Sequence, residues 1–272
     1  MSLVLVEQKQ PGVLWLTLNR PEIHNAFNDE VINDLLEQLD KAESDPEIRV
    51  LVLASSGKNF SAGADLNWMK SMKDASYEEN IFDALQLANL LYRLNHCSKP
   101  TICRIQGAAF GGGVGLVSCC DMAVAVKSAT FALSEVKIGL IPATISPYVV
   151  RAMGERNARR FFQTAETFTA ERASAMRLLH EVVETEAEMD AQIQLWIDGL
   201  LANGPHAMSE SKRLIGDVVA RPLSEDILRC TSEWIAKVRI SPEGQEGLRA
   251  FLDKRKPDWL AHTNIPGLKE NP

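Results

Sequence analysis

The chain has 272 residues, of which 46% are hydrophobic, and this is enough for one large α/β domain with a substantial core, with or without a helical appendage. Its formal net charge of −7 argues against a broad nucleic-acid surface, although the basic group Arg156, Arg159 and Arg160 could still bind phosphate. Five cysteines without a Cys-x-x-Cys spacing predict free thiols in a reducing compartment, here the cytoplasm. The early charge after the first apolar residues is typical of a strand and not of a signal peptide, and no apolar run reaches membrane-spanning length.

The first third of the chain predicts strands followed by a helix and a buried strand. Alternating apolar residues indicate paired strands over residues 3–9 and 13–18, with Pro11-Gly12 as the turn. Asn28 is a typical N-cap for a helix that reaches about Ser44. The almost continuous apolar run over residues 49–54 predicts a strand covered on both faces.

The same alternation continues to about residue 142. A second helix is expected over about residues 77–95, and strands are expected over residues 101–105, 122–126 and 130–133. Strands and helices in this order predict a right-handed βαβ array. From Ala143 onward the pattern is mostly helical. We predict a core domain over residues 1–200, followed by a C-terminal helical region over residues 201–272. The expected C-terminal helices cover residues 186–202, 205–219, 224–238 and 242–254.

The stretch over residues 106–121 is too rich in glycine for an ordinary strand or helix. Three consecutive glycines, Gly111, Gly112 and Gly113, remove every Cβ over one turn, so backbone N–H groups can approach a ligand. The apolar run over residues 114–120 predicts a short buried helix, whose unpaired N–H groups and dipole would favour an anion or a developing oxyanion. The spacing fits neither a P-loop nor a dinucleotide fingerprint. The alternative is that the glycines only allow a helix and a sheet to pack closely.

A second loop with small side chains, residues 55–65, follows the strand over residues 49–54. Since ligands gather at the carboxyl ends of strands in open α/β sheets, the two loops are expected to converge on one atom. Two N–H donors on one oxygen form an oxyanion hole, and each donor is worth about 3 to 4 kcal/mol when charge develops there.

The residue that moves a proton is expected to be Glu135. No Gly-x-Ser-x-Gly elbow is present, and the five histidines are scattered without triad or ligand spacing, so neither a metal nor a redox cofactor is expected. Glu135 stands in a semi-apolar segment, where desolvation would raise its pKa. The alternative for Glu135 is a helix-capping or salt-bridged carboxylate.

Four segments, in this order and spacing, resemble the enoyl-CoA hydratase/isomerase family, also called the crotonase family. They are Asn-Arg-Pro with Asn-Ala (19–21 and 25–26), Ser-Ala-Gly-Ala-Asp-Leu (61–66), the glycine stretch (107–121) and residues 131–142. The resemblance extends from about residue 3 to about residue 260. It implies an α/β, ClpP/crotonase-like fold of repeated ββα units with a C-terminal helical region that forms trimers.

The resemblance also implies the partners and the roles of single residues. The substrate would be an acyl-CoA, with coenzyme A as part of the substrate, and the assembly a homo-hexamer in which residues 251–257 reach a neighbouring subunit's CoA site. The N–H groups of Ala64 and Gly112 would hold the thioester carbonyl and stabilise its enolate, and Glu135 would be the catalytic glutamate. The CoA nucleotide and pantetheine path would be lined by His24, Ala26, Ala62, Asp65 and Leu66.

One position departs from the pattern of the family. Typical hydratases carry a second glutamate two residues after the glycine triplet, and this chain has Gly115 there. A double-bond isomerase needs only a single base that moves one proton between carbons, so the missing glutamate favours an isomerase.

Finer resemblance favours a hydratase. Residues 60–70, 111–116 and 134–147 are similar to bacterial methylglutaconyl-CoA and carboxygeranoyl-CoA hydratase-like members, which serve leucine and acyclic-terpene breakdown. We therefore predict a hydratase of a branched, carboxylated enoyl-CoA such as 3-methylglutaconyl-CoA. The substrate carboxylate, or a water held by Ser146 or Thr144, would then partly replace the missing glutamate. An isomerase with Glu135 as sole base is the alternative, and a non-catalytic acyl-CoA-binding or RNA-binding member is a third possibility.

Overall fold

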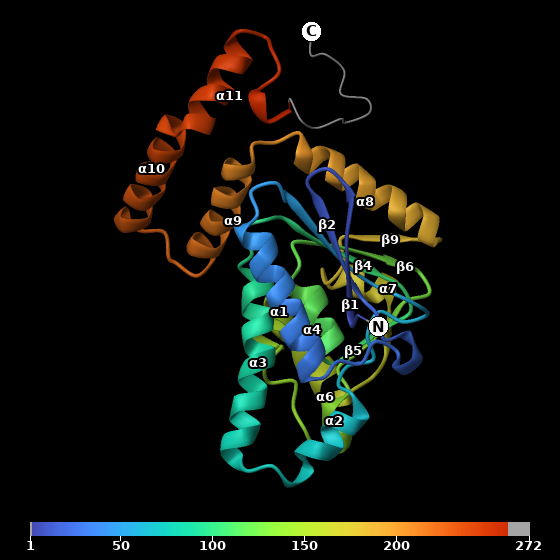
Figure 1. The fold of residues 1–272 in the computed structure, drawn as a ribbon. Coiled ribbons are helices and arrows are strands. Elements are labelled where there is room, and N and C mark those ends of the chain that lie inside the picture. The colour runs from blue at the N-terminus through green and yellow to red at the C-terminus, as the bar shows by residue number, and fades with distance from the viewer. Residues whose placement is uncertain (1, 261–272) are drawn as a thin grey trace.

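A six-stranded sheet forms the centre of the protein, which a computed structural model describes over residues 2–260 (Figure 1). Its strand order is β1-β2-β3-β4-β6-β9. β1 is antiparallel to β2, and every later neighbouring pair is parallel, which confirms the predicted array. The edge strand β9 was not predicted. These strands are β1 (Val4–Gln10), β2 (Val13–Leu18), β3 (Val50–Ser55), β4 (Thr101–Ile105), β6 (Met122–Val126) and β9 (Glu181–Val183).

Helices cover both faces of this sheet. α8 (Glu186–Leu201) runs along one face, and α1 (Asp29–Ser44), α3 (Tyr77–Asn95) and α4 (Gly112–Cys119) lie on the other (Figure 1). All six residues of β3 are buried, as its continuous apolar run predicted. Burying one large aliphatic side chain stabilises the fold by about 1.5 to 3 kcal/mol, so the sheet is a rigid platform for the loops at its carboxyl edge.

The glycine stretch corrects one prediction. It contains a strand, β5 (Ala108–Phe110), and α4 begins at Gly112, two residues earlier than the apolar run suggested. The glycines are needed here because the neighbouring backbone leaves no room for side chains. A methyl group at Gly113 would lie 2.9 Å from the Ser61 carbonyl oxygen. β5 belongs to a second, three-stranded sheet with β7 (Thr130–Ala132) and β8 (Phe168–Thr169).

The remaining short elements connect these layers. Residues 143–185 were expected to be mostly helical, and β8 and β9 interrupt the helices there. The connecting elements are η1 (Pro21–Ile23), α2 (Leu66–Ser71), η2 (Met72–Asp74), η3 (Glu135–Ile138), α5 (Ser146–Met153), α6 (Glu155–Thr164) and α7 (Ala170–Ala175).

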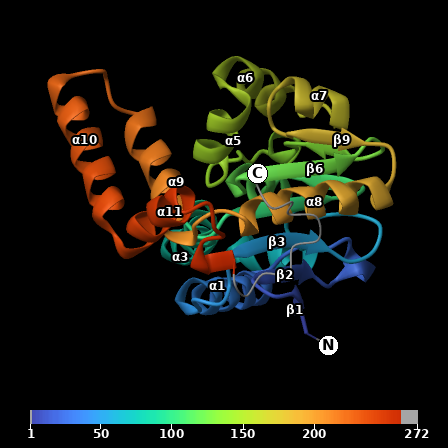
Figure 2. The same ribbon diagram turned by 90° about the horizontal axis from the view of Figure 1, so that it is seen from above.

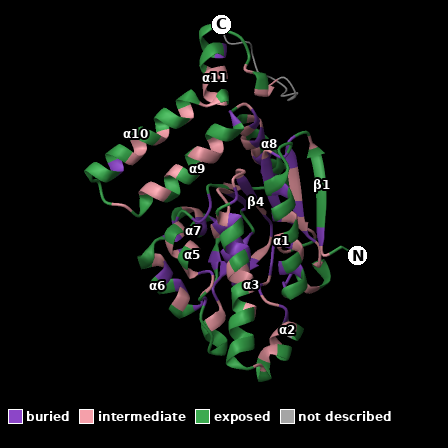
Figure 3. Cartoon of the chain, turned by 60° about the vertical axis from the view of Figure 1, so that its left-hand side comes forward, coloured by how far each residue is buried: buried purple, intermediate pink, exposed green. Residues whose placement is uncertain are grey.

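The C-terminal helices stand apart from the sheet (Figures 1 and 2). They are α9 (Pro205–Val219), α10 (Glu225–Ile240) and α11 (Pro242–Leu252), followed by η4 (Asp258–Leu260). Figure 3 shows that α9 and α10 are mostly exposed or half-buried, in contrast to the buried core. Arg49 links this region to β3, because its guanidinium donates to the carbonyl oxygens of Leu201 and Asn203 at 3.1 and 2.5 Å. The division at residue 200 stays a prediction, and residues 261–272 of the expected helical region lie outside the described residues.

Candidate active site

The loop that carries Ala64 is held by the backbone of Phe27. The Phe27 N–H donates to the Gly63 carbonyl oxygen at 2.9 Å, and the Asp65 N–H donates to the Phe27 carbonyl oxygen at 3.0 Å. These two bonds form a parallel bridge between Phe27 and Ala64. Since neighbouring residues of an extended segment point their N–H groups in opposite directions, the Ala64 N–H faces away from Phe27. It has no acceptor among residues 2–260.

The other side of the same loop is bonded to the strand that leads into the glycines. The Ser61 N–H donates to the Ala108 carbonyl oxygen at 3.0 Å, and the Phe110 N–H donates to the Ser61 carbonyl oxygen at 2.9 Å. β5 then passes through Gly111 into α4, whose first residue, Gly112, has no acceptor for its N–H within the described chain. The two loops are therefore joined by hydrogen bonds, with Ala64 and Gly112 on neighbouring segments, and their convergence on one ligand atom stays a prediction.

Glu135 lies beside these glycines, at the start of η3. A methyl group at Gly111 would lie 3.1 Å from Glu135 Oε1, and the other carboxyl oxygen, Oε2, is buried without a hydrogen-bond partner in the described part of the chain. Burial raises the pKa of Glu135, and a hydrogen bond from its own backbone N–H only partly offsets this. A half-buried carboxyl with a raised pKa and one unused oxygen is suited to exchange a proton with a ligand.

The place beside Gly115 is filled by apolar side chains. Gly115 lies one turn after Gly112 and is buried. A methyl group at Gly115 would lie 2.4 Å from Ile145 Cγ2 and 3.5 Å from Leu91 Cδ2, and both of these side chains are buried. A second carboxylate therefore cannot be added at Gly115 unless Ile145 moves.

Comparison with known proteins decides the family. A family model described as "Enoyl-CoA hydratase/isomerase" matches residues 8–262. The chain belongs to the enoyl-CoA hydratase/isomerase family. A solved enoyl-CoA hydratase from Shewanella pealeana is 44% identical to this chain, with a TM-score of 0.92. The match covers 95% of this chain and 96% of the Shewanella chain. A putative enoyl-CoA hydratase/isomerase (crotonase) from Legionella pneumophila is 47% identical with a TM-score of 0.86, with coverages of 95% and 99%. The 2,3-dehydroadipyl-CoA hydratase of Escherichia coli is 30% identical, over 94% of this chain and 98% of that protein. The crotonase fold is thereby confirmed.

The positions that the family resemblance places along the CoA path meet at one edge of the Ala64 loop. The Ala62 N–H donates to the His24 carbonyl oxygen at 2.9 Å, and Ala26 is buried two residues further along. His24 is exposed, with its Nδ1 3.0 Å from the Asn59 side-chain nitrogen. Asp65 instead has a structural environment, since it caps α2 through the Asn67 N–H at 2.7 Å. Leu66 begins α2, and its side chain lies outside the described residues. Binding of CoA by these residues stays a prediction.

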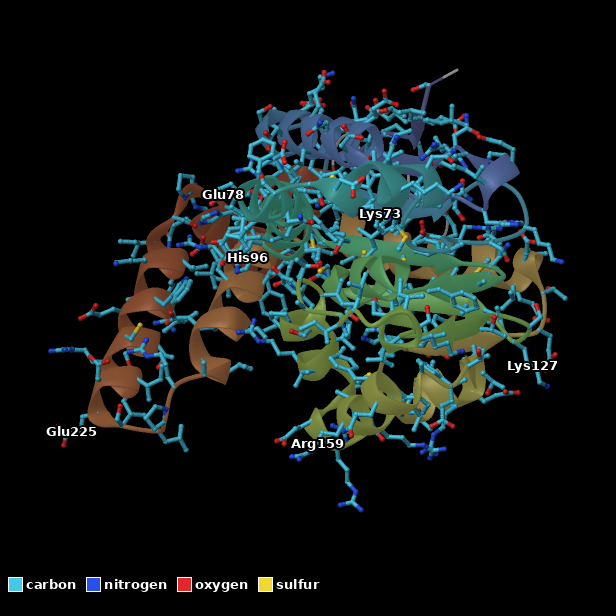
Figure 4. The ribbon with its side chains drawn as sticks, turned by 90° about the horizontal axis from the view of Figure 1, so that it is seen from below. Lys73, Glu78, His96, Lys127, Arg159 and Glu225 are labelled. Carbon is cyan, nitrogen blue, oxygen red and sulfur yellow. The ribbon has the colours of Figure 1, made fainter. Side chains whose placement is uncertain are left out.

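Two of the three arginines in the basic group are held by neighbouring acids. Arg159 pairs with Glu155 at 3.0 Å and Arg160 with Glu166 at 2.6 Å, so two members of the basic group are engaged by acids. Figure 4 shows Arg159 pointing away from the body of the protein. Over residues 2–260, no cluster of three or more His, Cys, Asp or Glu side chains is placed to hold a metal ion. Every helix in that range is too short or too polar to cross a membrane.

Three residues of the site were not singled out in the sequence for the contacts they make. Phe27 contacts both loops, Ile145 fills the space beside Gly115, and Gly111 touches Glu135. Phe27 and Ile145 are buried apolar residues, which sequence periodicity assigns to the core without a further role. A signal existed only for Gly111, because it belongs to the glycine triplet.

Proposed function

We propose that the protein adds water to the double bond of an enoyl-CoA thioester, with Glu135 as acid and base. The supporting observation is the pair of unpaired N–H groups, from Ala64 and Gly112, on adjoining segments beside the unpaired Glu135 carboxyl. Two preorganised donors at the position of a developing oxyanion are the main requirement for chemistry on a thioester enolate. Most of the chain's family relatives named above are hydratases.

In the proposed reaction, one carboxyl acts in both halves. Glu135 as a carboxylate takes a proton from water while the new C–O bond forms at the β-carbon. The electron pair of the double bond moves onto the thioester oxygen, where the Ala64 and Gly112 N–H groups hold it. The neutral Glu135 then returns the proton to the α-carbon, so one water molecule has been added and the carboxylate is restored. Burial raises the pKa of Glu135, which makes its carboxylate a stronger base and favours the first step, in which it takes a proton from water.

The proposed substrate is a branched enoyl-CoA with a far carboxylate, such as 3-methylglutaconyl-CoA. The proposal is supported by the relative from Escherichia coli, which acts on 2,3-dehydroadipyl-CoA, and by the apolar side chains beside Gly115, which leave room for no second acid. The Ser146 hydroxyl donates its proton to the Ala143 carbonyl oxygen at 2.7 Å. It therefore has only lone pairs to offer a water, and would orient it without delivering a proton. A carboxylate can also take up a proton from the water and return it, which the Ser146 hydroxyl cannot, so the substrate carboxylate is the better substitute of these two for the missing glutamate.

Isomerisation of an enoyl-CoA double bond is the second candidate. It is favoured by the apolar contact of Ile145 with Gly115, since a single base in a dry site is sufficient to move one proton between two carbons. The same two N–H donors would stabilise the dienolate. The family name includes both reactions.

The experiment that separates these candidates follows enoyl-thioester absorbance with three substrates: 3-methylglutaconyl-CoA, crotonyl-CoA and a 3-enoyl-CoA. Fast loss of absorbance with the first alone supports the specialised hydratase. Rising absorbance with the 3-enoyl-CoA, without hydration of the other two, makes the protein an isomerase. The Glu135→Gln variant is run beside the wild type, and full hydratase activity in that variant contradicts the role of Glu135.

The assembly and the compartment are part of the proposal. We expect a homo-hexamer, a dimer of trimers, and the C-terminal helices support this because they carry exposed apolar side chains: Ile215, Val219, Phe251 and Leu252 are 63%, 72%, 81% and 75% exposed. A mass of one chain by light scattering at micromolar concentration contradicts it. The five cysteines are all free, which fits a reducing compartment such as the cytoplasm.

A further inference from the structure

Phe27 contacts both of the segments that carry the proposed oxyanion donors. Its backbone bonds to Gly63 and Asp65, on either side of Ala64, at 2.9 and 3.0 Å. Its ring lies against the first residue of α4: a methyl group at Gly112 would lie 2.5 Å from Phe27 Cζ and 2.7 Å from Cε2. One residue therefore fixes one donor through its backbone and supports the other through its side chain.

Phe27 is itself firmly held. Its side chain is 4% exposed, and it is followed by Asn28, the N-cap of α1, whose side chain accepts from the Val31 N–H at 3.1 Å. On the other side, the buried Asn25 side chain donates to the carbonyl oxygens of Ser56 and Asn59, both at 2.8 Å. The backbone on both sides of Phe27 is thus anchored to α1 and to the loop after β3, which fixes the point from which the buried ring projects.

The Phe27 ring leaves no room for a side chain at position 112. A distance of 2.5 Å from a Cβ position is shorter than any van der Waals contact, so the ring can lie there only because residue 112 has no side chain. A smaller side chain at position 27 would leave a void behind the first turn of α4. The Gly112 N–H could then move relative to the Ala64 N–H, which stays bonded through its neighbours.

We propose that Phe27 is a positioning residue that sets the separation of the Ala64 and Gly112 N–H donors, and so the polarisation of the thioester carbonyl. The proposal rests on the function proposed above. It assigns to the Phe27 ring an effect on the reaction that is separate from its contribution to stability.

The test uses a CoA thioester of an aryl-substituted α,β-unsaturated acid, whose absorption band moves to the red when its carbonyl is polarised. The wild type is expected to produce the red shift. Phe27→Leu is expected to lose most of it and to lower kcat by about 10- to 100-fold with a smaller change in KM, because a displacement of the donors by a fraction of an ångström weakens transition-state contacts. The control is Phe161→Leu, a core phenylalanine of α6 that is 1% exposed, which should lower the melting temperature and leave the red shift intact.

The outcomes separate the two proposals. No red shift with the wild type contradicts the oxyanion hole itself. A red shift and a kcat in Phe27→Leu equal to those of the wild type overturn the role of Phe27 and leave the hole in place.

A second pair of variants keeps the test independent of activity. Gly112→Ala and Phe27→Ala are each expected to lower the melting temperature, and the double variant should lose less than the sum of the two, because the methyl group then occupies space vacated by the ring. The double variant should still lack the red shift. Melting temperatures that fall additively would show that the ring and Gly112 are not in the contact from which the proposal starts.

Discussion

The Arg20 guanidinium donates to the Asp65 carboxylate at 2.8 Å and joins the two segments that meet at the Ala64 loop. The same guanidinium donates to the Ala26 carbonyl oxygen at 2.9 Å. Both side chains are largely buried, with 16% and 9% of their surface exposed. The pair therefore holds the backbone at Phe27 in register with the backbone at Ala64, in a place that is largely shielded from water.

Removal of the Asp65 charge is expected to destabilise the protein. Asp65→Asn leaves the Arg20 charge buried and unpaired, which costs about 3 kcal/mol in the free energy of unfolding. Urea unfolding at pH 7 measures this. Arg159→Ala serves as the control, because it breaks an ion pair with Glu155 whose side chains are 72% and 75% exposed, and should cost less than about 1 kcal/mol. Equal losses in the two variants would contradict the structural role of the Arg20–Asp65 pair.

The Arg20–Asp65 pair should also make the stability of the protein depend on pH. Burial alone would raise the pKa of Asp65, but the Asn67 N–H and the Arg20 guanidinium outweigh it and hold the pKa below its usual value. The stability contributed by a depressed carboxyl pKa is present above the unfolded-state pKa of about 3.9 and is lost as the pH falls through the folded-state value. Wild type should therefore lose more stability than Asp65→Asn between pH 5 and the acid limit of folding, and parallel curves would be inconsistent with this.

The stability that Glu135 contributes should depend on pH in the opposite direction to that of Asp65. The folded-state pKa of Glu135 is raised by burial, so its contribution to stability is full below the unfolded-state pKa of about 4.3 and is lost as the pH rises through the folded-state value. Glu135→Gln is therefore expected to be at least as stable as wild type at pH 8 while losing about 100- to 10,000-fold in kcat. In the wild type, kcat/KM should rise with pH through the raised pKa. A loss of stability in Glu135→Gln that accounts for the lost activity would contradict the assignment.

Local patterns in the sequence predicted most of the fold. The N-cap at Asn28 and the helix over residues 77–95 depend on neighbouring residues alone, and the structure has both. The strand β5 could not be predicted, because its hydrogen-bonding partners, β7 and Ser61, lie far from it in the sequence. The glycines that follow β5, Gly111 to Gly113, oppose both strand and helix by local propensity, and α4 nevertheless begins among them.

The candidate site was predictable only where backbone exposure leaves a trace in the sequence. Small residues at Gly63, Ala64 and Gly112 indicated exposed N–H groups, and the structure brings their loops together. The contacts of Ile145 with Gly115 and of Phe27 with Gly112 join positions that are distant in sequence, and an apolar residue type does not identify its partner. Such pairs can be read only from the packed structure.

The apolar contact at Gly115 predicts a strong coupling between two substitutions. Gly115→Glu alone should unfold the protein or lower its melting temperature sharply, because its Cβ would lie 2.4 Å from Ile145 Cγ2. Adding Ile145→Ala should recover at least about 1 kcal/mol, as expected for residues in contact. Chemical unfolding of the wild type, both single variants and the double variant measures the coupling energy, and a value near zero would show that Ile145 does not block this position. If the double variant also gains hydration of crotonyl-CoA, the missing second carboxylate is what restricts the wild type.

The contact between Gly111 and Glu135 predicts that Gly111→Ala changes the chemistry as well as the stability. Gly111 has φ 52° and ψ −118°, a conformation in which a residue with a side chain is strained by about 1 to 3 kcal/mol. The methyl group of an alanine at position 111 would lie 3.1 Å from Glu135 Oε1. Gly139→Ala is the matched control, because Gly139 also has a positive φ, 78°, with nothing within 4 Å of the added methyl group. Both variants should lose stability in urea unfolding. Gly111→Ala alone should shift the pH profile of kcat/KM to higher pH, since the methyl group removes solvent from the carboxyl and raises its pKa further. Identical pH profiles in the two variants would mean that Gly111 acts only through its backbone conformation and not through its contact with Glu135.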